Sequence, residues 1–178
     1  MFVLLVGPKG SGKSHIGRTL ERKLGVLFFH VEPLWMEYYA ECKASSREPS
    51  NAEGIARVHP RIAAALEEHE HICVETTGAS PEILNALLSI TEASKMLVAR
   101  VAAPLDLCLQ RIATRDQENQ IPMNVETIRK VYALSIAAPL QPDLNLENTA
   151  LSEADIVSAF ESALIPHCSR RPQAGAAE

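Results

Sequence analysis

The sequence has no long hydrophobic run and no paired cysteine spacing. Its first apolar run ends at Val6 and follows no basic segment, so we expect neither a signal peptide nor a membrane span there. The four cysteines have no disulfide-like or metal-like spacing, which indicates reduced thiols: Cys42, Cys73, Cys108 and Cys168. We therefore expect a cytoplasmic protein that makes no membrane contact.

An excess of positive charge is also missing. The chain has 17 lysines and arginines against 22 acidic residues, a net charge of −5, which argues against a surface built to hold nucleic acid. Its 178 residues, 47% of them hydrophobic, are enough to bury a substantial core in one domain. We predict that domain over residues 1–165 and a disordered tail over 166–178, where small and polar residues dominate.

The most specific feature is a glycine-rich segment after the first apolar run. It follows the pattern G-x-x-x-x-G-K-S and reads Gly7-Pro8-Lys9-Gly10-Ser11-Gly12-Lys13-Ser14. Between a strand and a helix, this pattern predicts a P-loop whose backbone N–H groups surround the phosphates of a nucleoside triphosphate. The helix that starts here, including His15, adds a positive dipole end. Lys13 is expected to reach the β- and γ-phosphates, and the Ser14 hydroxyl to bind Mg²⁺.

The rest of the chain alternates apolar runs with helical patterns, which predicts an α/β fold with a parallel sheet. The expected strands are residues 2–6, 26–31, 71–75, 95–102 and 144–146. Helices are expected from Lys13 to the cap at Gly25, over 51–70 with a kink or break at Pro60, and after Ser80, Pro104, Asn124 and Ser152. Residues 33–50 are expected to be irregular.

A P-loop fixes the phosphate site but leaves the reaction open. A GTPase would carry an Asn-Lys-x-Asp segment, which does not occur, and an AAA-type module with a helical lid domain would need a longer chain. The chain instead has Arg111 and Arg115, four residues apart and therefore expected on one helix face, before the polar loop 116–120. Two arginines on a mobile flap can neutralise charge on a transferring phosphoryl group.

With these motifs, most of residues 1–164 resembles the small P-loop kinases, a group that includes shikimate, gluconate and polynucleotide kinases. The resemblance implies five parallel strands in the order 2-3-1-4-5, helices on both faces and a small lid that closes over ATP. It implies that Arg111 stacks on adenine, that Arg115 reaches the phosphates and that Asn148-Thr149 edges the adenine.

Acidic side chains follow two of the expected strands. Glu32 lies just past the second strand, where ligands bind in such sheets, and resembles the group's base that accepts the proton of the acceptor hydroxyl. Glu75 ends the third strand and can hold Mg²⁺ through water or, equally, stabilise a turn. Two further sets near these acids can bind an acceptor or serve only in packing and on the surface: Trp35, Tyr38 and Tyr39, and Arg57 and Arg61.

These observations predict an ATP- and Mg²⁺-dependent kinase that phosphorylates a hydroxyl of a small molecule. A polynucleotide 5′-kinase and an ATP-binding or hydrolysing regulatory module remain alternatives. Within residues 31–70 eight acidic residues stand against four basic ones, so nucleic acid is an unfavourable partner. We expect a monomer or a weak dimer.

Overall fold

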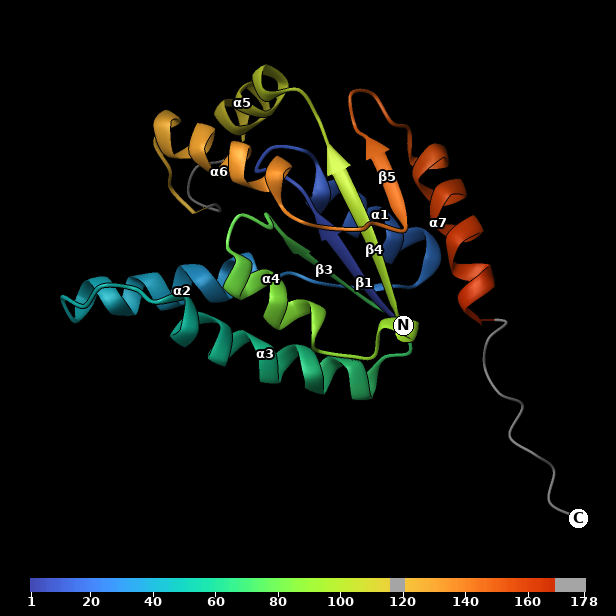
Figure 1. Ribbon diagram of the computed structural model, residues 1–178, viewed down its shortest axis with the longest axis horizontal. Helices are drawn as coiled ribbons and strands as arrows, with labels where there is room; N and C mark the ends of the chain where they lie inside the picture. The colour runs from blue at the N-terminus through green and yellow to red at the C-terminus, as the bar shows by residue number, and fades with distance from the viewer. Residues whose placement is uncertain (116–120, 169–178) are drawn as a thin grey trace, which may run out of the picture.

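The protein folds around a five-stranded, fully parallel sheet with the strand order β2-β3-β1-β4-β5 (Figure 1). The structure is a computed structural model, and it describes residues 1–115 and 121–168. The strands are β1 (Phe2–Val6), β2 (Leu27–Phe29), β3 (Ile72–Thr76), β4 (Met96–Ala102) and β5 (Leu144–Glu147). Both the expected sheet and its order are thus confirmed.

Seven helices and one short 3-10 turn connect the strands in the described part of the chain. They are α1 (Lys13–Leu24), α2 (Glu32–Ala44), α3 (Asn51–Glu68), α4 (Pro81–Leu88), η1 (Ala93–Lys95), α5 (Leu105–Thr114), α6 (Val125–Ala137) and α7 (Glu153–Cys168). Helix α7 thus continues past residue 165, where the tail was expected to begin. Residues 169–178, and the expected lid loop 116–120, lie outside the described residues.

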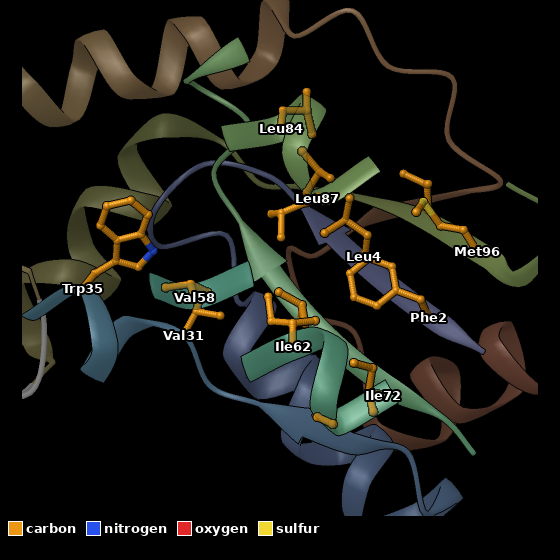
Figure 2. Packing of buried hydrophobic residues seen from close by; sticks show 14 of the residues in the cluster. Phe2, Leu4, Val31, Trp35, Val58, Ile62, Ile72, Leu84, Leu87 and Met96 are labelled. Atoms are coloured by element: carbon orange, nitrogen blue, oxygen red, sulfur yellow. The ribbon is translucent and has the colours of Figure 1, made fainter. Parts of the chain in front are cut away.

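Helices cover both faces of the sheet, because alternate residues of each central strand are apolar on opposite sides. On one face α1 and α7 pack Ile16, Leu20, Ile156 and Phe160 against the odd-numbered residues of β1. On the other face α2, α3 and α4 pack against the even-numbered residues. Figure 2 shows this second cluster, with Phe2 and Leu4 of β1 among Ile62, Leu84 and Leu87.

The expected helix caps are confirmed where the sequence signals were strongest. Gly25 ends α1 in the left-handed conformation, with φ of 66°. The side chains of Ser80 and Asn124 accept backbone N–H groups of Ile83 and Thr127 at the starts of α4 and α6. Local hydrogen-bonding chemistry therefore sets these boundaries.

Three sequence predictions are corrected by the structure. Residues 33–50 are not irregular throughout, because α2 spans Glu32–Ala44; Pro33 lies in its first turn, where a proline costs no hydrogen bond. Of the kink or break expected at Pro60, the break does not occur, because α3 continues from residue 51 to 68. Helix α5 ends at Thr114, so Arg115 adopts an extended conformation and does not share a helix face with Arg111.

No helix in the described part of the chain is both long and apolar enough to cross a membrane. The three cysteines whose side chains are described, Cys42, Cys73 and Cys108, are free and buried. Burial raises the pKa of the Cys73 thiol well above its ordinary value, and raises that of Cys108 as well. Both thiols therefore behave as small apolar groups of the core.

Candidate functional site

The candidate site is a cavity of about 380 Å³ at the carboxyl ends of the strands. Parallel α/β sheets place their ligand sites at this edge, because the strand-to-helix loops and helix N-termini meet there. Helices α5 and α6 lie beyond the same edge in Figure 1. The glycine-rich loop, Glu32, Glu75, Arg111 and Arg115 all contribute to the lining, so the structure brings the main predicted residues together.

The glycine-rich loop has the geometry of a phosphate cradle. Gly10 and Gly12 have φ of 84° and 95°, a conformation that disfavours any side chain. Gly7 is required for space instead, because a Cβ atom there would lie 2.0 Å from the Val101 carbonyl oxygen. The loop ends at Gly12, and α1 begins at Lys13, so the positive end of the helix dipole faces the cavity.

Lys13 is held inside this loop. Its Nζ donates to the carbonyl oxygens of Gly7 at 2.8 Å and Pro8 at 3.0 Å, and the residue is 7% exposed. Burial lowers the pKa of Lys13, and the carboxylate of Glu75 only partly offsets this. The buried ammonium has no carboxylate in direct contact among the described residues, so an anionic phosphate is the partner that its surroundings favour.

Ser14 and Glu75 form an oxygen-rich pair beside the loop. The Ser14 hydroxyl lies 2.9 and 3.0 Å from the two carboxylate oxygens of Glu75 at the end of β3. A hydroxyl and a carboxylate are the oxygen donors that Mg²⁺ prefers near phosphates. The residues predicted to hold the metal are therefore adjacent and chemically suited to it.

Glu32 is the centre of a second polar cluster. Its Oε1 accepts the backbone N–H of Ile121 at 3.0 Å and lies 3.4 Å from Nζ of Lys9, while its Oε2 lies 3.5 Å from Nη2 of Arg115. Lys9 also donates to the Ile121 carbonyl oxygen at 2.7 Å. One carboxylate therefore connects the glycine-rich loop to the residues on both sides of 116–120.

Burial and charge oppose each other at Lys9. Burial lowers the pKa of its ammonium, and Glu32 is the main group that raises it again. Glu32 therefore favours the charged form of Lys9, against the effect of burial. Sequence analysis placed Lys9 among the phosphate ligands, whereas its side chain binds Glu32 and Ile121 here; its backbone remains part of the loop.

His30 lies between the two carboxylates. Its Nε2 is 3.7 Å from Oε1 of Glu75 and 3.9 Å from Oε2 of Glu32, and its ring stacks on Phe28 at a centroid separation of 5.5 Å. The buried Nε2 atom has no hydrogen-bond partner among the described residues. From the sequence, His30 could assist or bind substrate, but we did not place it among the site residues, because a histidine near the end of a strand is more often structural.

Arg111 and Asn148 support the loop from the opposite side. Arg111 donates to the carbonyl oxygens of Gly10, Ser11, Asn148 and Thr149 at 3.0 to 3.5 Å. Asn148 Nδ2 donates to the Ser11 carbonyl oxygen at 2.8 Å and is buried. In this arrangement the guanidinium of Arg111 is fixed against the glycine-rich loop. The predicted site residue His15 is exposed and lines the cavity.

Some of the remaining candidate residues line the cavity, and the others lie in the core or on the surface. Trp35 and Tyr39 line the cavity, whereas Tyr38 is buried in the core and its hydroxyl contacts Ser50 and Glu53. Arg57 pairs with Glu41 at 2.7 Å and lies over the Tyr38 ring, and neither Arg57 nor Arg61 lines the cavity. Of the two alternatives for Arg57 and Arg61, the exposed helix face agrees with the described residues, and binding of an anionic acceptor has no support in them.

Comparisons with known proteins support a P-loop domain, but they correct the argument from chain length against an AAA-type module. A protein family described as "AAA domain" matches residues 2–132, and the described residues beyond the match form the end of α6, β5 and α7. No curated protein matches the chain.

Among solved structures, a sugar kinase from Janibacter sp. HTCC2649 has a TM-score of 0.63 at 14% identity, covering 96% of this chain and 98% of its own. A gluconokinase from Sinorhizobium meliloti 1021 has a TM-score of 0.60 at 13% identity, covering 95% and 97%. A shikimate kinase from Aquifex aeolicus has a TM-score of 0.52 at 19% identity, covering 96% and 100%. These similarities confirm the fold of the small P-loop kinases.

Proposed function

This chain belongs to the AAA domain family, and we propose that it is an ATP-dependent phosphotransferase that moves the γ-phosphoryl group to a hydroxyl of a small molecule. The family match and the P-loop support nucleotide binding. The observation that carries the transfer reaction is the position of Glu32. This carboxylate lines the same cavity as Lys13 and Ser14 and lies 3.5 Å from Arg115, so an acid, a phosphate cradle and a cation share one small space.

In the proposed reaction the acceptor hydroxyl oxygen attacks the γ-phosphorus. A new P–O bond forms, the bond from the γ-phosphorus to the bridging oxygen breaks, and ADP leaves with that electron pair. Glu32 accepts the proton of the hydroxyl as the oxygen attacks. Lys13 and Arg115 balance the negative charge on the phosphoryl oxygens, and exclusion of water by the surrounding helices strengthens these interactions.

Ser14 and Glu75 would hold Mg²⁺ beside the phosphates. When bound, the ion would neutralise charge between the β- and γ-phosphoryl oxygens. The adjacency of the hydroxyl and carboxylate oxygens, at 2.9 and 3.0 Å, supports this assignment. Arg111 and Asn148 keep the carbonyl groups of the loop turned away from the phosphates, because they donate to those oxygens.

A direct assay tests the proposal. The purified chain is incubated with ATP, Mg²⁺ and a panel of hydroxylated compounds; ADP release is followed with coupled enzymes and the product identified by mass spectrometry. We expect ADP release to depend on one acceptor class and to disappear in Lys13→Ala, with circular dichroism unchanged. ADP release that no acceptor accelerates would contradict the proposal and favour a regulatory ATP-binding module.

A further inference from the structure

The half of the cavity that faces away from the glycine-rich loop is lined by apolar side chains. Helices α2, α3 and α4 supply most of them, and the segment before α6 supplies two. The residues are Val31, Trp35, Tyr39, Ile55, Val58, Ile83, Leu87, Ile121 and Met123. Figure 2 shows Trp35, Val31 and Val58 grouped on one side of the buried cluster and Leu87 on another. This set is defined here as the apolar wall.

The apolar wall is held in place by close packing of α2 on α3. A Cβ atom at Gly54 would lie 1.9 Å from the Trp35 ring, so the indole rests directly on the backbone of α3. Tyr38, on the next turn of α2, donates from its hydroxyl to the Ser50 carbonyl oxygen at 3.2 Å and accepts the Ser50 N–H at 2.7 Å. The position of Trp35 is therefore fixed before any ligand arrives.

Apart from Glu32 at the start of α2, no charged side chain of α2 or α3 lines the cavity. Arg57 pairs with Glu41 and Arg47 pairs with Glu53, both on the exposed surface. The cations that line the cavity belong to the glycine-rich loop, to α1 and to the end of α5, and not to α2, α3 or α4: Lys9, Lys13, Arg18, Arg111 and Arg115. Within the described residues, the apolar wall thus offers no cation for a carboxylate or phosphate on the acceptor.

The boundary between the two halves is acidic. Glu32 and Glu75 line the cavity where the apolar wall meets the glycine-rich loop, and His30 Nε2 lies within 4 Å of both carboxylates. A negative group on the acceptor would meet these two carboxylates on one side, where Lys9 and Arg115 are already paired with Glu32, and hydrocarbon on the other. Both contacts are unfavourable, the first by repulsion and the second by loss of hydration.

From these observations we propose that the acceptor is an uncharged alcohol with an apolar or aromatic body. Its hydroxyl lies at Glu32, and its body fills the space against Trp35, Ile55 and Val58. This inference rests on the proposed function, since it names the acceptor of the same site. Polyhydroxylated and acidic acceptors suit this site less well, because they need polar or cationic groups where this chain has the apolar wall.

Two measurements test the acceptor class. The chain has a single tryptophan, Trp35, so its fluorescence reports ligands that reach the apolar wall without any turnover. Titrations compare 2-phenylethanol, 4-(2-hydroxyethyl)benzoate and gluconate. We expect the neutral aromatic alcohol to change the emission and to bind at least tenfold more tightly than the other two. We then test ATP-dependent phosphorylation of the same three probes and of a series of alcohols from butanol to hexanol. Along the alcohol series, kcat/KM should rise about fourfold per added methylene.

A matched pair of variants tests whether the apolar wall determines the KM of the aromatic alcohol. Ile55→Thr introduces a hydroxyl into the wall and should raise the KM of the aromatic alcohol about tenfold while leaving the KM of ATP unchanged. Leu66→Thr makes a comparable change on the same helix but outside this cavity, and should alter neither constant. An equal increase in both variants would contradict the proposed role of the wall.

The outcomes separate this inference from the proposed function. Phosphorylation of gluconate or the benzoate in preference to the neutral alcohols would overturn the acceptor class and leave the phosphotransferase intact. ATP turnover that no alcohol of either kind accelerates would overturn the proposed function and the acceptor class with it.

Discussion

Replacing Glu32 by glutamine tests whether Glu32 acts as a catalytic base or only holds neighbouring residues in place. The change keeps the shape of the side chain and its hydrogen bond from the Ile121 N–H, but removes the charge that Lys9 and Arg115 face at 3.4 and 3.5 Å. A glutamine cannot accept the proton of an acceptor hydroxyl. Loss of a general base lowers kcat by about 10²- to 10⁴-fold, so we expect a decrease in this range at saturating ATP and acceptor.

The same substitution has a predictable effect on stability. The side chains of Lys9 and Glu32 are only 10% and 14% exposed, so water replaces the lost ion pair poorly. Because glutamine still offers Lys9 a neutral oxygen, the loss is smaller than for a fully broken buried ion pair and costs about 1–3 kcal/mol. For a domain of this size, the melting temperature should fall by about 2–12 °C in a thermal denaturation scan at pH 7.

The stability loss of Glu32→Gln should depend on pH. Burial lowers the pKa of Lys9 in the folded state and Glu32 raises it, so the variant lowers that pKa further. A lysine whose pKa is lower in the folded state binds fewer protons when folded than when unfolded, so its charged form lowers the free energy of unfolding near neutral pH. This destabilisation decreases as the pH rises toward the pKa of the unfolded lysine, because the ammonium then loses its proton. The difference in free energy of unfolding between the two proteins should therefore be largest near neutral pH and shrink in alkaline solution.

Glu41→Gln is the matched control, because Glu41 lies on the same helix and pairs with Arg57 on the exposed surface. Exposed ion pairs contribute at most about 1 kcal/mol, so this variant should keep its kcat and nearly all of its stability. A Glu32→Gln protein with kcat within about threefold of the original would refute Glu32 as the base. A lowered melting temperature with an unchanged kcat would leave the carboxylate as an anchor only.

Further predictions address the phosphate end and the partner class. Lys13→Ala should lower kcat by at least about 100-fold and abolish the thermal stabilisation by ATP, measured by scanning fluorimetry; unchanged turnover in the folded variant would refute the P-loop assignment. Arg115→Ala should lower kcat more than it raises the Kd of ATP, measured by single-turnover kinetics and calorimetry. Arg111→Ala should instead weaken ATP binding, because its guanidinium holds the carbonyl groups of the loop. Single-stranded oligonucleotides should not bind at physiological salt in a fluorescence anisotropy assay; micromolar affinity with a steep salt dependence would favour the polynucleotide kinase alternative.

The phosphate end of the site could be predicted from the sequence because its chemistry is local. Gly10, Gly12 and Lys13 lie within four residues of one another, and their spacing alone determines where the backbone N–H groups point. The strand order could also be predicted, but only from the resemblance to the small P-loop kinases. Neither inference needs knowledge of contacts between distant residues.

The acceptor end could not be predicted in the same way, because it depends on distant contacts. Glu32 was identified from its place after a strand, but its contact with Ile121 joins residues 89 positions apart. Trp35 and Ile55 come from different helices, and the first of these helices was missed because residues 33–50 were expected to be irregular. The apolar wall exists only once α2 and α3 pack together, and Arg57 and Arg61 face away from it for the same reason.

Lys13, which is buried, and Lys9, which is half-buried, place unfavourable charge in the glycine-rich loop of the free protein. Burial lowers the pKa of both Lys9 and Lys13, so each ammonium is less stable here than in water. Apolar residues would fill these positions at lower cost, so stability alone does not explain the two charges. Glu32 offsets the cost at Lys9, whereas the close partners of Lys13 among the described residues are backbone carbonyl groups. A bound triphosphate would place negative charge beside the Lys13 ammonium. The interaction that is absent in the free protein would then contribute to the affinity for the nucleotide.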